Sequence, residues 1–281
     1  MKLDLPYLRQ WIGRQDVGEE CASEGLVSRF NAMLDLGQAA QQGAIAPQLI
    51  HFCLAPAAAP TSELGEDGHP AKGGFLPPVP LPRRMWAGGS LNFGAPIRVG
   101  AMVSRRSTIR DVAVKEGRSG VLCFVTVDHE ITSDGEVAVS ERQDIVYRAA
   151  DSGASGQPVK STVAAAPEGT WRETVEPTSP LLFRYSALTY NGHRIHYDLP
   201  YTRDVEGYPG LVVHGPLQAT LLIHLAARAK GRPPASFKFR SVSPLYSNAS
   251  LTLNASEEGD SLKLWTARPD GPVAMEATAT W

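Results

Sequence analysis

The sequence predicts an α+β protein built from two similar halves, in each of which apolar helical material precedes an antiparallel meander of strands. A stretch rich in Ala, Ser, Gly and Pro, without apolar periodicity, occupies 147–171, just past the centre of the 281-residue chain. Such a composition is typical of a linker. Segments with apolar/polar alternation fill the end of each half, as expected for strands. The predicted domains are 1–148 and 171–281, joined by a linker at 149–170.

The first half is predicted to open with helical material at 35–56, which contains short apolar and alanine-rich runs interrupted at Pro47. A loop dense in glycine and proline is expected at 68–89. Strands are predicted over 90–117, 120–135 and 136–148, because these segments carry β-branched residues in frequent alternation with polar ones. Turns at 117–120 and 133–135 separate the strands.

The second half is predicted to repeat this order, beginning with a loop-rich section at 177–210. A helix is expected from 215 to 231, because its leucines recur on one helical face. Pro216 suits the first turn of that helix, and Gly231 suits its end. Strands at 235–246, 248–256, 260–270 and 273–281 follow. One helix and a curled meander make a hot-dog, so the chain is predicted to be a double hot-dog, with two antiparallel sheets each wrapping a central helix.

The overall composition excludes several classes of protein. The formal net charge is −2, which does not favour nucleic acid or a membrane surface as a partner. Three cysteines lack metal-ligand spacing and fit a reducing compartment. The amino-terminal residues show no secretory signal pattern, and no apolar run approaches the length of a membrane span. We therefore expect a soluble, cytoplasmic protein.

A candidate anion-binding point lies at the start of the predicted 215–231 helix. The first N–H groups of a helix lack partners within it and carry partial positive charge, so they can stabilise an anion. Proline at 216 has no N–H, which leaves the N–H of Gly215 as a donor beside His214. Glycine also lets a ligand approach the backbone closely. The same residues equally fit a simple cap on a buried helix.

The stretch "YNGHRIHYD", 190–198, supplies a candidate acid/base residue in His196. Histidine can take up and return a proton near neutral pH. Asn191 can orient a water or a carbonyl through its amide, but it cannot transfer a proton. A lone histidine of this kind is also common as a surface or core residue. Metal binding is not predicted, because the pair His193 and His196 lacks a clear third ligand on a defined element.

Further side chains are candidates for binding a ligand. His193 and Arg194 follow Asn191, while Arg83 and Arg84 stand beside Trp86 in the predicted loop. Arginine pairs well with carboxylates and phosphates, although solvated loop positions explain these residues as well. The chain contains no G-x-S-x-G nucleophile motif and no G-x-x-x-x-G-K-[ST] phosphate loop. No cofactor is expected.

Taken together, "YNGHRIHYD" and "YPGLVVHGPLQATLL" resemble the MaoC-like, or R-specific, enoyl-thioester hydratase family. The signature of that family is Gly-Asp-x-Asn-Pro-Ile-His, followed by Val-His-Gly and an apolar helix. The segments 62–93, 117–131 and 141–148 look like its N-terminal, dehydratase-type hot-dog. Within the family, the chain is similar to the branch of mesaconyl-C4-CoA hydratases and hydroxyacyl-thioester dehydratases.

The resemblance implies reversible hydration of a 2-enoyl thioester, with an acyl-CoA or acyl-carrier thioester as the partner. It implies that His196 is the catalytic histidine and that the N–H of Gly215 polarises the thioester carbonyl. Asn191 falls where the signature has aspartate, which puts a two-group acid/base mechanism in doubt. The first half lacks the signature and is expected to shape the acyl pocket. A hot-dog thioesterase and a non-catalytic thioester-binding subunit are the alternatives, and the double hot-dog is expected as a monomer or homodimer.

Overall fold

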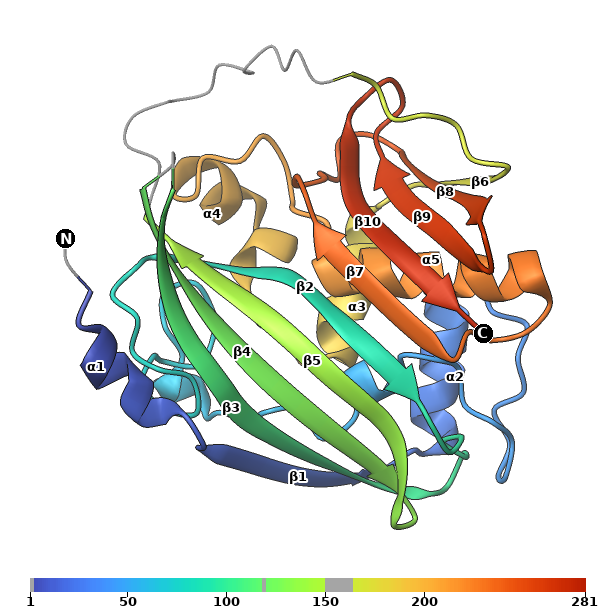
Figure 1. Ribbon diagram of the computed structural model, residues 1–281, viewed down its shortest axis with the longest axis horizontal. Helices are drawn as coiled ribbons and strands as arrows, with labels where there is room; N and C mark the ends of the chain where they lie inside the picture. Colours follow the sequence, from blue (N-terminus) through green and yellow to red (C-terminus); the bar gives the residue numbers. More distant parts are fainter. Residues whose placement is uncertain (1–2, 118–119, 150–163) are drawn as a thin grey trace.

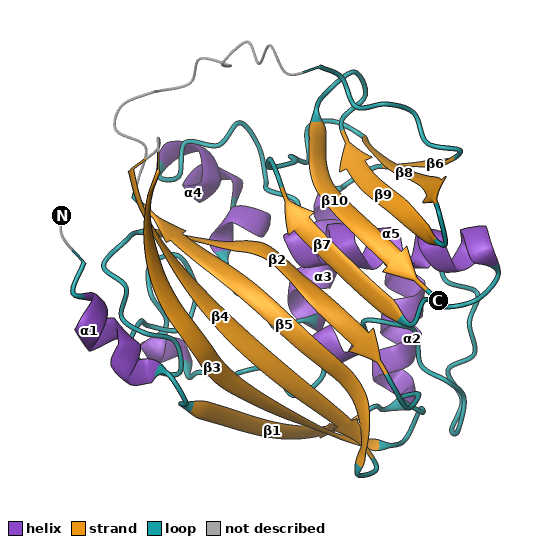
Figure 2. Ribbon diagram, viewed as in Figure 1, coloured by secondary structure: helices purple, strands orange, loops and turns teal. Residues whose placement is uncertain are grey.

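A single curved antiparallel sheet of ten strands runs through the molecule (Figures 1 and 2). The computed structural model describes residues 3–117, 120–149 and 164–281. The strand order is β1-β3-β4-β5-β2-β7-β10-β9-β8-β6. The strands of the first half are β1 (Gln15–Cys21), β2 (Arg83–Phe93), β3 (Met102–Gly117), β4 (Gly120–Ser133) and β5 (Glu136–Arg148). Those of the second half are β6 (Trp171–Val175), β7 (Ser236–Ser241), β8 (Leu251–Glu258), β9 (Ser261–Ala267) and β10 (Val273–Thr280).

The two halves share this sheet, so the prediction of two separate sheets is corrected. Strand β2 pairs with β5 on one side and with β7 on the other. The pairing of β2 with β7 runs from Gly88↔Arg240 to Asn92↔Ser236. Glycine permits this close approach, since a Cβ on Gly88 would lie 2.7 Å from the carbonyl oxygen of Phe239. Arg83, Arg84 and Trp86 therefore stand on a central strand rather than in a loop.

The central helix of the second half agrees with its prediction. Helix α5 (Gly215–Lys230) packs against β7, β8, β9 and β10. Pro216 lies in its first turn, and Gly231 ends it in the left-handed conformation with φ of 68°. The helix is buried along much of its length, and Leu217 and Leu222 are fully covered. One hydrophobic core extends from this helix into the first half.

The helix of the first half was placed wrongly by sequence. Helix α2 (Glu24–Met33) comes before 35–56, and that segment is mostly loop with a short 3₁₀ helix, η2 (Ile50–Cys53). Ser23 caps α2 by accepting from the N–H of Leu26. The apolar residues of α2 recur on one face and reach the common core. In 35–56, two glycines and Pro47 interrupt the pattern before a helix can form.

Short helices occupy the section 177–210, which was predicted to be loop-rich. They are α3 (Ser179–Leu188), η4 (Arg194–His196) and α4 (Leu199–Asp204). Thr178 caps α3, and Asp198 caps α4 through its side chain. Helix α3 packs against α2, and η4 lies beside both α3 and α4. The remaining short helices are α1 (Leu5–Leu8), η1 (Arg9–Trp11) and η3 (Thr61–Glu63).

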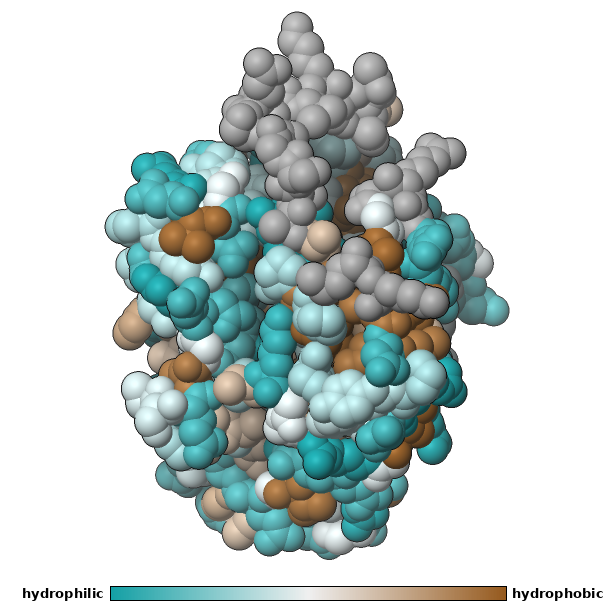
Figure 3. All heavy atoms as spheres, turned by 90° about the vertical axis from the view of Figure 1, so that its left-hand side faces the viewer, coloured by the Kyte–Doolittle hydropathy of each residue, from teal (hydrophilic) through white to brown (hydrophobic). Residues whose placement is uncertain are grey.

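Parts of two predicted connections, residues 118–119 and 150–163, lie outside the described residues. The predicted turn at 133–135 is confirmed, because Asp134 and Gly135 have φ of 48° and 88° between β4 and β5. On the side of the molecule seen in Figure 3, hydrophilic side chains predominate and apolar ones form small groups. No helix within the described part is long and apolar enough to cross a membrane.

Candidate active site

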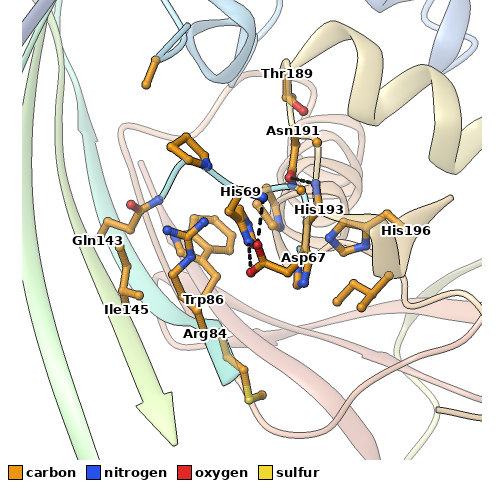
Figure 4. Close-up of a pocket in the computed structure, with 18 of the residues that line it drawn as sticks. Asp67, His69, Arg84, Trp86, Gln143, Ile145, Thr189, Asn191, His193 and His196 are labelled. Atoms are coloured by element: carbon orange, nitrogen blue, oxygen red, sulfur yellow. Dashed lines mark hydrogen bonds and ion pairs between the residues drawn. The ribbon is translucent and has the colours of Figure 1, made fainter. Parts of the chain in front are cut away.

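A cavity of about 930 Å³ is lined by residues from both halves of the chain. Strands β2 to β5 and the 61–76 segment contribute from the first half, and the 183–197 segment and the start of α5 contribute from the second. Seven of the nine predicted site residues line it, namely Arg83, Arg84, Trp86, Asn191, His193, His196 and Gly215. Figure 4 shows how the side chains of several of them gather.

His196 is held in one tautomer by the backbone. Its Nδ1 lies 2.7 Å from the carbonyl oxygen of Val212. A carbonyl oxygen only accepts, so Nδ1 carries the hydrogen and Nε2 keeps its lone pair. Burial lowers the pKa of His196 to about 4, although the bond to Val212 acts in the opposite direction. His196 is therefore a neutral base at neutral pH.

His214 lies behind His196, away from the cavity wall where it was predicted to bind substrate. The two rings are stacked, with centroids 3.6 Å apart and planes at 18°. Nε2 of His214 lies 2.8 Å from Oγ of Ser186 on α3. The side chain is fully buried, and burial holds its pKa well below the usual value. The structure thus gives His214 a supporting position, because it fixes the ring plane of His196 from behind.

Gly215 brings a backbone donor to the cavity. It is the first residue of α5, where intrahelical acceptors are lacking. None of the hydrogen bonds among the described residues uses its N–H. A Cβ at this position would lie 3.1 Å from Cε3 of Trp86, so the ring packs directly against the glycine. The positive end of a 16-residue helix and a free N–H therefore meet at one point of the cavity wall.

Asn191 forms a tight turn with His193. Its Oδ1 accepts a hydrogen bond of 3.0 Å from the N–H of His193. Because the carbonyl end of the amide is engaged, the NH₂ group is the part of Asn191 that remains for a ligand or a water. The ring of His193 stands edge-on to that of His196, with centroids 5.4 Å apart. Burial lowers the pKa of His193, and the neighbouring His69 and His196 lower it further.

Arg194 is directed away from the cavity, so its predicted contact with substrate is not supported. Its guanidinium makes bonds of 2.9 and 2.8 Å to Asp198 and one of 3.0 Å to the carbonyl oxygen of Glu66. It also lies 4.0 Å from the ring centre of Tyr201. The contact with Glu66 ties the 190–198 segment to the 61–76 segment. Asp198 is engaged by the same pairing and does not line the cavity.

The three predicted residues on β2 differ in their surroundings. Arg83 donates to the backbone oxygen of Glu206 at 2.9 Å and lies 5.4 Å from the ring centre of Tyr208. Arg84 and Trp86 lie beside each other in the close-up of the cavity (Figure 4). The indole of Trp86 packs at 4.5 Å from the ring of Phe239, and its buried Nε1 has no partner within the described residues. Arg84 is hydrogen-bonded to Tyr147, which also lines the cavity.

Sequence reasoning missed two residues from the first half, Asp67 and His69. Oδ2 of Asp67 lies 2.9 Å from Nδ1 of His69, and the ring of His69 lies 4.1 Å from that of His193. The signal was present in the sequence as Asp-Gly-His at 67–69, which matches Asn-Gly-His at 191–193. Donor atoms of Asp67, His69 and His193 lie within 4.8 Å of one another, so these side chains could hold a metal ion.

The cavity also extends into the first half, where it meets other buried polar groups. Nε2 of His51 lies 3.3 Å from Oε2 of Glu141, and Oγ of Ser107 lies 2.8 Å from Nδ1 of His129. All four residues line the cavity. Oε1 of Glu141 is buried without a partner in the described part of the chain. Apolar side chains such as Val127, Ile131 and Ile145 line the cavity beside them, so the first half offers polar groups within a largely apolar wall.

Comparisons with known proteins identify the family. The sequence model of the family described as hydroxyacyl-thioester dehydratase type 2 matches residues 48–247 of this chain. The chain is 43% identical to mesaconyl-C(4)-CoA hydratase from Chloroflexus aurantiacus over 271 residues, which is 95% of each protein. The chain belongs to the hydroxyacyl-thioester dehydratase type 2 family. A mitochondrial enzyme of that name from Schizosaccharomyces pombe is 27% identical over 78% of this chain and 79% of its own length.

Solved structures share the fold of this chain. HtdX from Mycobacterium tuberculosis superposes with a TM-score of 0.66 and 16% identity, covering 95% of this chain and 99% of its own. A second protein of that organism, described as a double hot-dog, gives a TM-score of 0.58 and 12% identity over 96% of each chain. The predicted double hot-dog architecture is thereby confirmed.

Proposed function

We propose that this chain catalyses the reversible addition of water to a 2-enoyl-CoA, which gives a 3-hydroxyacyl-CoA. One observation carries the proposal: a neutral histidine, His196, and a free helix-start N–H, at Gly215, line the same cavity. Hydration needs a base for the attacking water and a donor for the thioester oxygen, on which negative charge develops. In this proposal, His196 serves as the base and the N–H of Gly215 serves as the donor. The family and its 43% identical relative support the same reaction class.

In this proposal, His196 moves the proton. Its Nε2 accepts a proton from the water as the oxygen adds to the β-carbon, and the resulting imidazolium returns that proton to the α-carbon. The Val212 carbonyl keeps Nδ1 protonated throughout, so that only Nε2 exchanges. The stacked ring of His214 holds the imidazole plane fixed. A fixed base near its reacting atom contributes about 10²- to 10⁴-fold to the rate.

The Gly215 N–H is proposed to bind the thioester oxygen, together with the positive end of α5. An N–H placed toward a developing oxyanion contributes on the order of 3–4 kcal/mol to transition-state stabilisation. Asn191 is proposed to hold the reacting water through its NH₂ group, because its carbonyl oxygen is engaged by His193. Asn191 then orients the water and takes no proton.

For the substrate, we propose a short branched or dicarboxylic 2-enoyl-CoA of the mesaconyl type. The name of the Chloroflexus relative supports this choice. The cavity wall offers Arg84 as a cation and polar side chains from the first half, such as Gln143 and His129. An arginine in a partly buried site favours a carboxylate on the ligand. Arg84→Gln should therefore raise KM for mesaconyl-CoA more than for crotonyl-CoA, whereas Arg106→Gln, exposed on β3 and outside the cavity, should change neither.

The experiment that tests the function is an assay with crotonyl-, mesaconyl- and longer 2-enoyl-CoA thioesters. Loss of the conjugated absorbance and release of free thiol are followed together, for the wild type and for His196→Ala. We expect absorbance loss without thiol, abolished in the variant while the circular dichroism spectrum stays unchanged. Thiol release would indicate a thioesterase instead. Binding without turnover of any substrate would indicate a non-catalytic thioester-binding protein.

A further inference from the structure

The two halves of the chain contribute matching turns that face each other in the cavity. In the second half, Oδ1 of Asn191 accepts from the N–H of His193 at 3.0 Å. In the first half, Oδ1 of Asp67 accepts from the N–H of His69, also at 3.0 Å. Each turn has glycine in the middle and histidine at the end. The two turns differ at the first residue, which is an amide in one and a carboxylate in the other.

Backbone contacts lock these two turns together. Gly68 and Gly192 approach so closely that a Cβ on Gly192 would lie 2.6 Å from the carbonyl oxygen of Gly68. The N–H of Arg194 donates to the carbonyl oxygen of Asp67 at 2.9 Å, and its guanidinium donates to that of Glu66. The Asp67 turn is therefore a fixed part of the site and not a passing surface loop.

From Asp67, two imidazole rings, those of His69 and His193, lead to the proposed base, His196. Asp67 bonds to Nδ1 of His69 at 2.9 Å, the rings of His69 and His193 are 4.1 Å apart, and those of His193 and His196 are 5.4 Å apart. We call these four residues the Asp67–His196 array. Burial favours a neutral carboxyl, but the contacts with His69 outweigh it and hold the pKa of Asp67 well below its usual range. Other titratable groups act on the array, namely Lys72, Arg84, Tyr147, Tyr201 and His214.

We propose that Asp67 is the carboxylate of this acid/base centre, supplied by the first half in place of the one that Asn191 lacks. The inference rests on the proposed hydration reaction and adds no bond-making step to it. The water gives its proton to Nε2 of His196 as the C–O bond forms, and the proton then goes to the α-carbon. Asp67 stays ionised and balances the positive charge of the imidazolium that exists between these two proton transfers. It is a positioning residue, which also fixes the tautomer of His69.

This charge balance is needed because the array is buried beside a cation. The positive charge of Arg84 acts on both His69 and His193, and the 2.9 Å contact between Asp67 and Nδ1 of His69 is the negatively charged contact that opposes it. Arg84 carries a positive charge that opposes an imidazolium in the array. The Asp67 carboxylate, held against Nδ1 of His69, has the opposite sign and lowers the cost of that state without altering the geometry of His196.

The test is Asp67→Asn, with Glu66→Gln as the matched control. Asparagine can still accept from the N–H of His69, as Asn191 does for His193, so the turn is kept while the charge is lost. We expect kcat for hydration to fall roughly a hundredfold, with KM little changed. Glu66 is exposed and contacts Arg194 only through its backbone oxygen, so its variant should match the wild type.

A second variant separates charge from structure. Asp67→Glu keeps a carboxylate in this turn while Asn191 and its NH₂ group stay in place, and we expect it to retain at least a tenth of the wild-type kcat. Wild-type kcat in Asp67→Asn, or an Asp67→Glu variant as slow as Asp67→Asn, would overturn the proposal even if His196→Ala is inactive and hydration stands. Loss of activity on chelation, regained with stoichiometric zinc, would overturn it in favour of a metal held by Asp67, His69 and His193.

Discussion

The pH dependence of hydration gives the sharpest test of the environment of His196. The proposed base must be neutral to accept a proton from water. Burial lowers its pKa from 6.5 to about 4, with the charge of His69 adding to the effect and the Val212 carbonyl opposing it. The perturbation is therefore a fall in pH from 7.5 to 5.5, a range in which an ordinary histidine becomes protonated and His196 does not.

The expected magnitude follows from the two pKa values. With a pKa of about 4, about 97% of His196 is still neutral at pH 5.5. With an ordinary pKa of about 6.5, only about 9% would be neutral at that pH, compared with about 91% at pH 7.5. We therefore expect kcat/KM to change by less than about 10% between these pH values, whereas an ordinary histidine would lose about tenfold.

The assay is the initial rate of absorbance loss at low 2-enoyl-CoA concentration, which reports ionisations of the free enzyme. The fold must be checked at each pH, since a buried histidine with a lowered pKa stabilises the protein above about pH 6.5 and this contribution is lost as the pH falls toward 4. Tryptophan fluorescence serves this purpose. A tenfold loss centred near pH 6.5 in protein that remains folded would refute the assignment of His196 as a buried neutral base.

Three further predictions concern the framework of the site. Ser186→Ala leaves Nε2 of His214 without its 2.8 Å partner and should lower the free energy of unfolding by about 1–3 kcal/mol in urea titrations; an unchanged midpoint would contradict the role of this bond. Leu222→Ala, on the buried face of α5, should cost about 2–5 kcal/mol by the same measurement. Gly68→Ala places a Cβ against the carbonyl oxygen of Gly192 at a φ of 84°, so we expect lower thermal stability and reduced hydration. Full activity in that variant would show that the two turns need not be in contact.

Much of the fold could be predicted because its signals are local. Helix α5 carries its own periodicity, its proline and its terminal glycine, and the strand segments after it alternate regularly. The first half was harder. Helix α2 spans ten residues, and 35–56, with its alanines, looked more helical than it is. That segment stays irregular because the glycines and Pro47 prevent a continuous run, while the tertiary core selects α2 instead.

The motif in the second half indicated His196, Asn191 and Gly215, and all three line the cavity. His214 and Arg194 stand in the same motif, yet one is buried behind His196 and the other points toward Asp198. Sequence spacing cannot distinguish these outcomes. The direction of a side chain in a loop depends on what packs against it from elsewhere in the chain.

By itself, the sequence determined the class of the protein, the place of its main helix and three residues that line the cavity, Asn191, His196 and Gly215, since each depends on neighbours within a few positions. Only the tertiary structure decided that β2 and β7 join the halves into one sheet, and that Asp67 and His69 reach His193. These pairings connect residues more than a hundred positions apart. Long-range contacts of this kind depend on how the two halves pack together, which no local pattern encodes.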